Sequence, residues 1–113
     1  MKVIYNKFIP FKGYLAMNLF GILFVRKDKK DIYLMNKDII DNHEKIHTSQ
    51  MKELLYLFFY IIYLLNYIIN ILSFKFRSIK ESYRNIKFEK EAYQNERDMS
   101  YLKNRKHFAW WRI

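Results

Sequence analysis

The residues most able to do chemistry form the pattern His43-Glu44-x-x-His47, which contains two of the three histidines of the chain. On a helix, positions four apart project from one face, so both imidazoles can bind the same zinc ion. Glu44 then lies where it can accept a proton from a zinc-bound water. The pattern predicts a zinc site with hydrolytic chemistry. The plainer alternative is a helix whose two histidines are solvated or packed in the core.

A catalytic zinc site needs a third protein ligand and keeps its fourth position for water or substrate. One extension of the motif adds a Gly and a third His further along the same stretch, but Gln50 and Glu53 stand at those positions. On a continuing helix, Glu53 faces away from the two histidines. The third ligand is therefore expected from an acidic residue of a later helix, and residues 88–96 supply candidates.

The H-E-x-x-H motif followed by Glu89-x-x-Ala92 resembles the gluzincin metallopeptidases. Within that group the closer likeness is to the minimal gluzincins and to the membrane-associated branches that include the CaaX prenyl proteases, the HtpX-type proteases and the BlaR-type sensor peptidases. The resemblance implies that Glu89 is the third zinc ligand, beside the two histidines, and that Ala92 permits close helix packing. Tyr93 stands where the family usually has an Asp that hydrogen-bonds the first histidine, which is a departure from the pattern. Glu91 is the alternative metal ligand.

The resemblance implies a zinc metalloendopeptidase that acts on a peptide or protein substrate, with Zn²⁺ as its cofactor. Glu44 would be the catalytic general base, which takes a proton from water and later passes it to the leaving amine. Tyr93, Tyr83 and His107 are candidates for stabilising the transition state, and nothing in the sequence selects among them. By analogy with the family, the substrate is expected to lie extended along an edge strand within Leu19–Val25.

The expected fold class is α+β, with a small and mostly antiparallel N-terminal sheet in residues 1–36. Leu19–Val25 has the length and the β-branched and aromatic content of a strand. Val3–Tyr5 and Ile32–Met35 are shorter candidates. The sheet is expected to precede the active-site helix.

From Asp38 onward the chain has no Gly or Pro and is predicted to be helical. Asp38 or Asp41 can begin the active-site helix, because Asp41 with Glu44 three residues later resembles a capping box. This helix is expected to run through Gln50 and beyond. Ser78 with Glu81 is a similar start signal. The last helix, which would contain the third ligand, is expected over residues 87–103.

Between these helices lies Leu54–Phe74, a segment without a charged residue that is long enough to cross a bilayer. The sequence leaves three interpretations of this segment: a membrane span, an interfacial helix, or a helix buried in the core. Its tyrosines recur at three- and four-residue spacing, which suits either an interfacial stripe or one edge of a core helix.

Zinc binding by Glu89 would restrict this segment. An unbroken helix from His47 to Phe74 would carry the chain about 40 Å from the site. The residues from there back to Glu89 span at most about 50 Å when fully extended, which leaves no room for a helix beginning near Ser78. Either the segment kinks or turns, around Asn66–Asn70, or the last helix is not over residues 87–103. We favour a bent helix or a helical hairpin with an apolar face able to enter a membrane interface.

The 113 residues are predicted to form one domain, 1–113. The absence of Cys excludes disulfide bonds and thiol chemistry. The net charge of +10 divides into +6 over residues 1–30, −2 over 31–74 and +6 over 75–113. The basic ends allow an alternative function, a non-catalytic module that binds membrane lipid or nucleic acid. Nucleic acid is not favoured as a partner, because such a module leaves the H-E-x-x-H motif unexplained.

A further alternative is a structural zinc protein, in which a side chain fills the fourth position and no hydrolysis occurs. No secretory signal is recognised near the N-terminus, so the expected location is the cytoplasm or a membrane surface. The membrane contact would be made through residues 54–74.

Overall fold

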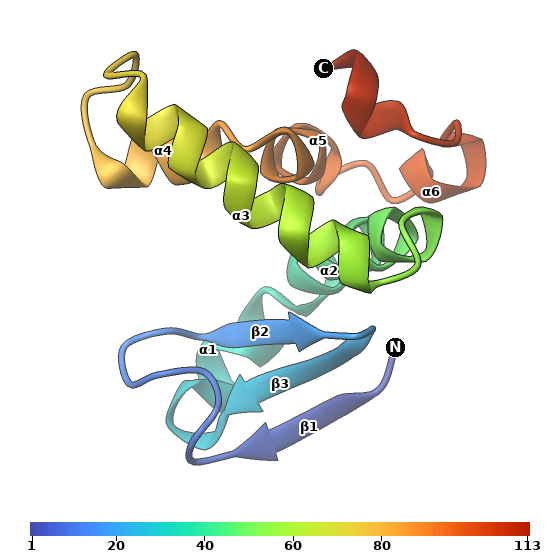
Figure 1. Cartoon of the computed structure of the whole chain (residues 1–113). Coiled ribbons are helices and arrows are strands. Elements are labelled where there is room, and N and C mark those ends of the chain that lie inside the picture. The colour runs from blue at the N-terminus through green and yellow to red at the C-terminus, as the bar shows by residue number, and fades with distance from the viewer.

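A computed structural model describes residues 1–113 and has the expected α+β class, with a three-stranded sheet followed by helices (Figure 1). The strands are β1 (Val3–Asn6), β2 (Ala16–Leu19) and β3 (Ile22–Arg26). The helices are α1 (Lys30–Met35), α2 (Lys37–Glu53), α3 (Leu57–Leu72), α4 (Ile79–Arg84), α5 (Lys87–Asn95) and α6 (Tyr101–Asn104), with short 3₁₀ helices at Lys27–Lys29 and Ala109–Arg112. In Figure 1 the sheet lies on one side of α2, and α3 crosses in front of α2.

The sheet has the order β1-β3-β2, so β2 is an edge strand. Only the pairing of β2 with β3 is antiparallel, because β1 runs parallel to β3. The prediction of one strand over Leu19–Val25 was wrong. Phe20 and Gly21 both have positive φ, +54° and +91°, and form the two-residue turn of a hairpin. The third predicted strand, Ile32–Met35, is also wrong, because it lies in helix α1.

The edge strand β2 is fixed to α2 by one buried side chain, Asn18. Its Nδ2 donates hydrogen bonds to the backbone oxygen of Glu44 at 3.0 Å and to Oγ1 of Thr48 at 3.1 Å. Its Oδ1 accepts one from the N–H of Gly21. Asn18 therefore ties the hairpin to the turn of α2 that contains Glu44.

Of the two predicted helix N-termini, at Asp38 or Asp41 and at Ser78, only the one at Ser78 has the expected cap. Helix α2 begins at Lys37 without a side-chain cap, and Asp41 lies inside the helix, where it accepts hydrogen bonds from Tyr33 and Lys37. The predicted capping box at Asp41 is therefore wrong. Ser78 does cap α4, because its Oγ accepts a hydrogen bond from the N–H of Glu81. The expected helix over residues 87–103 is interrupted between α5 and α6.

The apolar segment turns back, as expected if Glu89 lies beside His43 and His47, but at a different place. The break lies at Leu54–Tyr56, where Leu55 and Tyr56 have φ of +54° and +62°, and α3 is continuous across the predicted break at Asn66–Asn70. Helices α2 and α3 are bent by 110° relative to each other, and no single helix is long and apolar enough to cross a membrane. The two asparagines bond to other elements and do not interrupt their own helix: Asn66 accepts from the N–H of Lys87, and Asn70 donates to the oxygen of Ser82.

The helical half encloses an aromatic core shared by α2, α3, α5 and the C-terminal segment. Its buried members are Met51, Phe59, Ile86, Phe88 and Trp110. The rings of Phe59 and Phe88 stack with centroids 4.6 Å apart, which joins α3 to α5. The tyrosines of α3 pack against this core, so the interfacial-stripe interpretation is wrong for them and the core-edge interpretation is confirmed.

A buried ion network holds the C-terminal segment to α2 and α5. Arg105 forms two hydrogen bonds with Glu53, at 2.9 and 3.0 Å, and is also paired with Glu91. The side chains of Arg105 and Glu53 are 5% and 6% exposed, and that of Glu91 is fully buried. Two carboxylates away from water therefore depend on one guanidinium for their counter-charge.

We predict that Arg105→Ala lowers the free energy of unfolding by about 3–5 kcal/mol, because removing one partner leaves buried charge uncompensated. Urea denaturation followed by circular dichroism measures the change. Lys37→Ala is the matched control, since it removes an ion pair whose lysine is 52% exposed, and it should have a much smaller effect. Equal effects of the two substitutions would contradict the importance of the buried network.

Candidate metal centre

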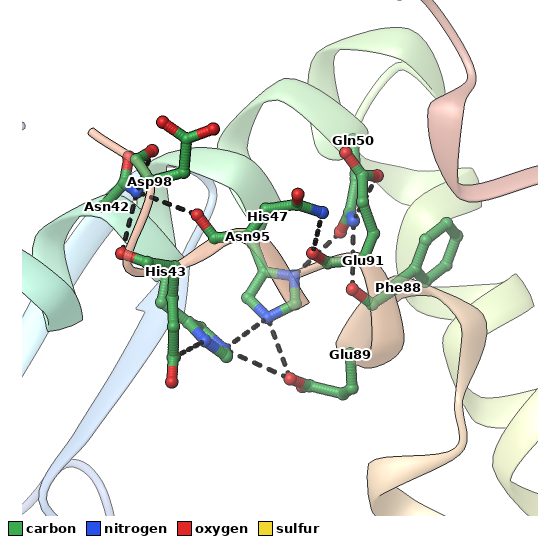
Figure 2. A network of polar contacts seen from close by, with 10 residues as sticks. Asn42, His43, His47, Gln50, Phe88, Glu89, Glu91, Asn95 and Asp98 are labelled. Carbon is green, nitrogen blue, oxygen red and sulfur yellow. Dashed lines mark hydrogen bonds and ion pairs between the residues drawn. The ribbon is translucent and has the colours of Figure 1, made fainter. Parts of the chain in front are cut away.

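The two histidines of α2 and one glutamate of α5 converge on a single point. Oε1 of Glu89 lies 3.2 Å from Nε2 of His43 and 3.1 Å from Nε2 of His47, and the two Nε2 atoms are 3.1 Å apart. Figure 2 shows the three side chains directed toward one another. The packing of α2 against α5 thus brings together residues more than forty positions apart in sequence.

These separations fit a zinc ion. Zinc bonds of 2.0–2.1 Å in tetrahedral geometry place neighbouring ligand atoms about 3.3 Å apart. The three atoms form a triangle with sides of 3.1–3.2 Å, so a displacement of a few tenths of an ångström would complete one face of such a tetrahedron. Two imidazoles and one carboxylate are also a donor set found at catalytic zinc sites. The residues present therefore fit the metal.

The second nitrogen of each imidazole is held by another side chain. Nδ1 of His43 lies 2.7 Å from Oε2 of Glu96, and Nδ1 of His47 lies 2.8 Å from Oε1 of Gln50. Both partners are acceptors, so each Nδ1 carries a proton, and Nε2 is the nitrogen of each ring that can bind a metal once it is deprotonated. Glu96 thus makes the contact that the sequence pattern lacked at Tyr93.

Glu96 is positioned by hydrogen bonds from a side chain of α2 to the C-terminal end of α5. The buried amide of Asn42 donates to the backbone oxygens of Asn95, Glu96 and Asp98, at 3.2, 2.9 and 3.1 Å. These carbonyls follow the last turn of α5, where intrahelical partners run out. Asn42 directly precedes His43, so neighbouring residues of α2 bind the C-terminal end of α5 and the side chain of Glu96.

Glu89 is held in its anionic form. Burial alone would raise the pKa of this carboxyl, but the nearby imidazoles of His47 and His43 and a hydrogen bond from Tyr63 outweigh burial and lower the pKa well below its usual range. The Tyr63 hydroxyl donates to Oε2 at 2.6 Å. The other carboxylate oxygen, Oε1, is left directed at the two histidines.

The pKa of His47 moves in the opposite direction. Burial acts to lower this pKa, and the Glu89 carboxylate, which is both a close charge and a hydrogen-bond partner, raises it to about 9. The His47 side chain is 6% exposed. The site thus concentrates negative charge where a cation, here a proton on imidazole, is favoured.

Glu44 lies beside the histidines with one oxygen buried and unpaired. Its Oε2 has no hydrogen-bond partner in the protein. Burial raises the pKa of this carboxyl, although the two neighbouring histidines oppose the increase. A ligand atom of Glu44 lies within 4.8 Å of those of His43 and His47. An unpaired buried carboxylate oxygen at this place is suited to accept a proton from a molecule that enters the site.

A cavity of about 510 Å³ opens onto the metal centre. Glu44, His47 and Glu89 lie in its wall, and strand β2 contributes Ala16–Leu19. Most of the remaining wall is aromatic and comes from α3, from Tyr83 of α4 and from the loop between β1 and β2. The volume is typical of small-molecule sites and exceeds what one water needs.

Three other candidates lie away from this centre or beside it. Glu91 binds Gln50, Tyr101 and Arg105, so it does not point at the histidines. Tyr93 packs edge-on against the ring of His43, at 4.7 Å, and is not in the cavity wall.

The third of these candidates, His107, is 92% exposed. It lies beside a separate hollow near Glu53 and Arg105. Of the tyrosine and histidine candidates for stabilising the transition state, only Tyr83 borders the cavity.

Four contributors to the site were not predicted from the sequence: Asn42, Gln50, Tyr63 and Glu96. Glu96 has a readable signal, because it lies seven residues after Glu89 and therefore two turns along the same helix face. Gln50 likewise lies one turn after His47. The roles of Asn42 and Tyr63 depend on contacts between distant elements, which no local pattern indicates.

No protein-family model, curated protein or solved structure matches this chain.

Proposed function

We propose that the chain is a zinc-dependent metallopeptidase of the gluzincin type, with His43, His47 and Glu89 as zinc ligands and Glu44 as general base. The observation that carries the proposal is the triangle of ligand atoms with 3.1–3.2 Å sides, next to an unpaired carboxylate oxygen and open to a cavity. A bound zinc ion would supply Lewis acidity toward water and the scissile carbonyl.

The protein groups have separate roles in this proposal. Glu44 Oε2 accepts the proton of the attacking water and later transfers it to the leaving amine. Glu96 and Gln50 keep the imidazoles oriented through Nδ1. Tyr83 borders the cavity as a neutral hydroxyl, because burial and the Glu89 carboxylate raise its pKa. It is the candidate donor to the developing oxyanion.

A peptide substrate is proposed to bind along β2. The outer edge of this strand faces the cavity, and Tyr60 occupies part of it by accepting from the N–H of Phe20 and donating to the oxygen of Asn18. By the two-residue alternation of a strand, Ala16 lies on the same edge as Asn18. Its backbone groups would pair with an extended peptide, the usual mode of strand addition.

The alternatives account for less of this arrangement. A structural zinc site would have its fourth position filled by a side chain, whereas here a 510 Å³ cavity adjoins the ligands. A basic module without a metal gives no role to the converging imidazoles. The basic module also gives no reason for the buried oxygen of Glu44 that has no partner.

Replacing the proposed third ligand should abolish tight zinc binding. We expect Glu89→Ala to weaken zinc affinity far more than Glu91→Gln, because only Glu89 is directed at the two histidines. Competition with a chelator of known affinity, on protein shown to be folded by circular dichroism, measures the difference. A larger loss in Glu91→Gln would move the ligand assignment to that residue.

Glu96 should act as a positioning residue. We expect Glu96→Ala to weaken zinc binding by about 10–100-fold, the usual effect of removing a carboxylate that orients a ligand histidine. Tyr93→Phe is the matched control, because it keeps the ring packed on His43 while removing only the hydroxyl. If both variants bind zinc as the wild type does, Glu96 does not orient His43.

Glu44→Gln should retain zinc and lose hydrolysis. We expect peptide cleavage to fall by a factor of at least about 100–10,000, since the amide cannot accept the proton of the water. Zinc content and cleavage of a mixture of unstructured peptides are measured on the same preparation. Full activity in this variant, or wild-type protein that binds zinc without cleaving any peptide, would contradict the peptidase proposal.

A further inference from the structure

The outward face of α3 is entirely apolar. Its exposed residues are all Leu, Ile or Phe: Leu57, Phe58, Ile61, Leu64, Leu65, Ile68, Ile69, Ile71 and Leu72. At 100° per residue these nine positions cover roughly 160° of the helix surface without one polar side chain. An exposed apolar face this continuous marks an interaction surface.

The polar side chains of α3 face the protein interior, the reverse of an ordinary surface helix. Tyr63 donates to Glu89, Asn66 accepts from the backbone of α5, and Asn70 donates to the backbone of α4. A helix that bounds a protein against water has the opposite arrangement, with its apolar stripe inward. The sequence of α3 is therefore suited to an apolar medium on its outer side.

A second exposed apolar element borders the same cavity as α3. Phe8, Phe11 and Tyr14, in the loop between β1 and β2, are 82%, 79% and 66% exposed. Phe11 and Tyr14 line the cavity together with Tyr60 and Tyr63 of α3. Apolar surface thus lies on two elements that flank the cavity.

Basic residues predominate beside both elements, and the first acidic residue after α3 is Glu81, whose carboxylate accepts a hydrogen bond from the N–H of Arg77. No acidic residue occurs in residues 1–27 or in residues 54–80. The basic residues adjoining the two apolar elements are Lys7, Lys12, Lys75, Arg77 and Lys80. An anionic surface is complementary to this pattern, whereas a second copy of the chain would bring like charges together.

We propose that the outward face of α3 and the loop between β1 and β2 dock on a lipid bilayer that contains anionic headgroups. The 16 residues of α3 extend about 24 Å, less than the roughly 30 Å thickness of a hydrocarbon core, so α3 lies in the plane of the interface. Its apolar face enters the acyl boundary, and the lysines and arginine beside it contact headgroups. The proposal is independent of peptidase activity, because it depends on surface residues outside the metal centre.

Vesicle sedimentation tests the apolar face. The full chain is mixed with phosphatidylcholine vesicles containing phosphatidylglycerol, and Leu65→Glu/Ile68→Glu is compared with Leu34→Glu/Met35→Glu. The control pair lies on α1, where the side chains are 48% and 83% exposed. We expect binding by the wild type and the control, and at least a tenfold loss in the α3 variant. Circular dichroism verifies that each variant is folded.

Charge reversal tests the anionic headgroups. Lys75→Glu/Arg77→Glu/Lys80→Glu should weaken binding by roughly a hundredfold or more, because each basic residue near an anionic surface contributes about a factor of five. Added salt should weaken wild-type binding in the same direction. Binding to pure phosphatidylcholine vesicles with equal affinity would overturn the headgroup part of the proposal.

Two results would overturn docking by α3. One is wild-type protein that remains in solution with either kind of vesicle. The other is an α3 variant that sediments with vesicles as the wild type does. Analytical ultracentrifugation shows whether a non-binding wild type is a dimer that Leu65→Glu/Ile68→Glu converts to a monomer, in which case a second copy covers this face.

Discussion

The structure depends on one geometric constraint: α2 and α5 must approach closely enough for three ligand atoms to meet within 3.2 Å. Because α3 and α4 lie between these helices in sequence, the chain must reverse soon after His47. It does so at Leu55 and Tyr56, both of which have the left-handed backbone that costs non-glycine residues energy. The N–H of Tyr56 bonds to the oxygen of Met51 at 2.7 Å, and the side chain of Met51 lies in the core that α5 shares. Packing around the turn thus offsets the strain that the turn introduces.

A continuous set of buried polar contacts connects the candidate metal centre to the C-terminal segment. Gln50 accepts from Nδ1 of His47 and donates to Glu91, and Glu91 is paired with Arg105. Arg105 is in turn held by Glu53, the last residue of α2, which lies two residues before the turn at Leu55. Each of these buried groups is a partner of the next, and such a network favours one arrangement of the elements around it. The position of the imidazole of His47 therefore depends on residues far from it in sequence.

The sequence was sufficient for those parts of the site that have a helical period. The spacing of His43 and His47 predicted a shared face, and the structure brings Glu89 to that face. The reversal of the apolar segment was also predictable, because a straight helix could not return in time. Its location was not, since Leu55 and Tyr56 are unusual choices for positive φ and are held there by tertiary contacts. Asn66 and Asn70 were misleading for the same reason: their side chains bond across to other elements.

The turn between β2 and β3 was also not predictable from the hydrophobic pattern. Phe20-Gly21 lies inside a continuous apolar run, so hydrophobic pattern favours one long strand, while the turn depends on the positive φ that Gly21 accepts. Asn18 immediately precedes that run and separates it from the apolar residues before it, and in the structure it is the residue that joins β2 to α2. A polar residue beside an apolar segment thus lies where the sheet meets α2, the helix that contains His43 and His47. Local patterns alone could not distinguish this role from a simple break.

Helix α3 has its polar side chains inward and its apolar side chains outward, which reduces the hydrophobic stabilisation of this small chain. The interior contains ten buried apolar residues and seven that are polar or charged, several of them at the candidate metal centre. Such an interior gives up hydrophobic stabilisation in exchange for a specific arrangement of ligands and their partners. The nine apolar side chains on the outer face of α3 are exposed, so in water they contribute no hydrophobic stabilisation. Burial of that face in an apolar interface would add hydrophobic stabilisation and would leave the inward contacts of Tyr63 and Asn66 unchanged. One face of α3 therefore contacts the candidate metal centre, and the opposite face is the proposed docking surface.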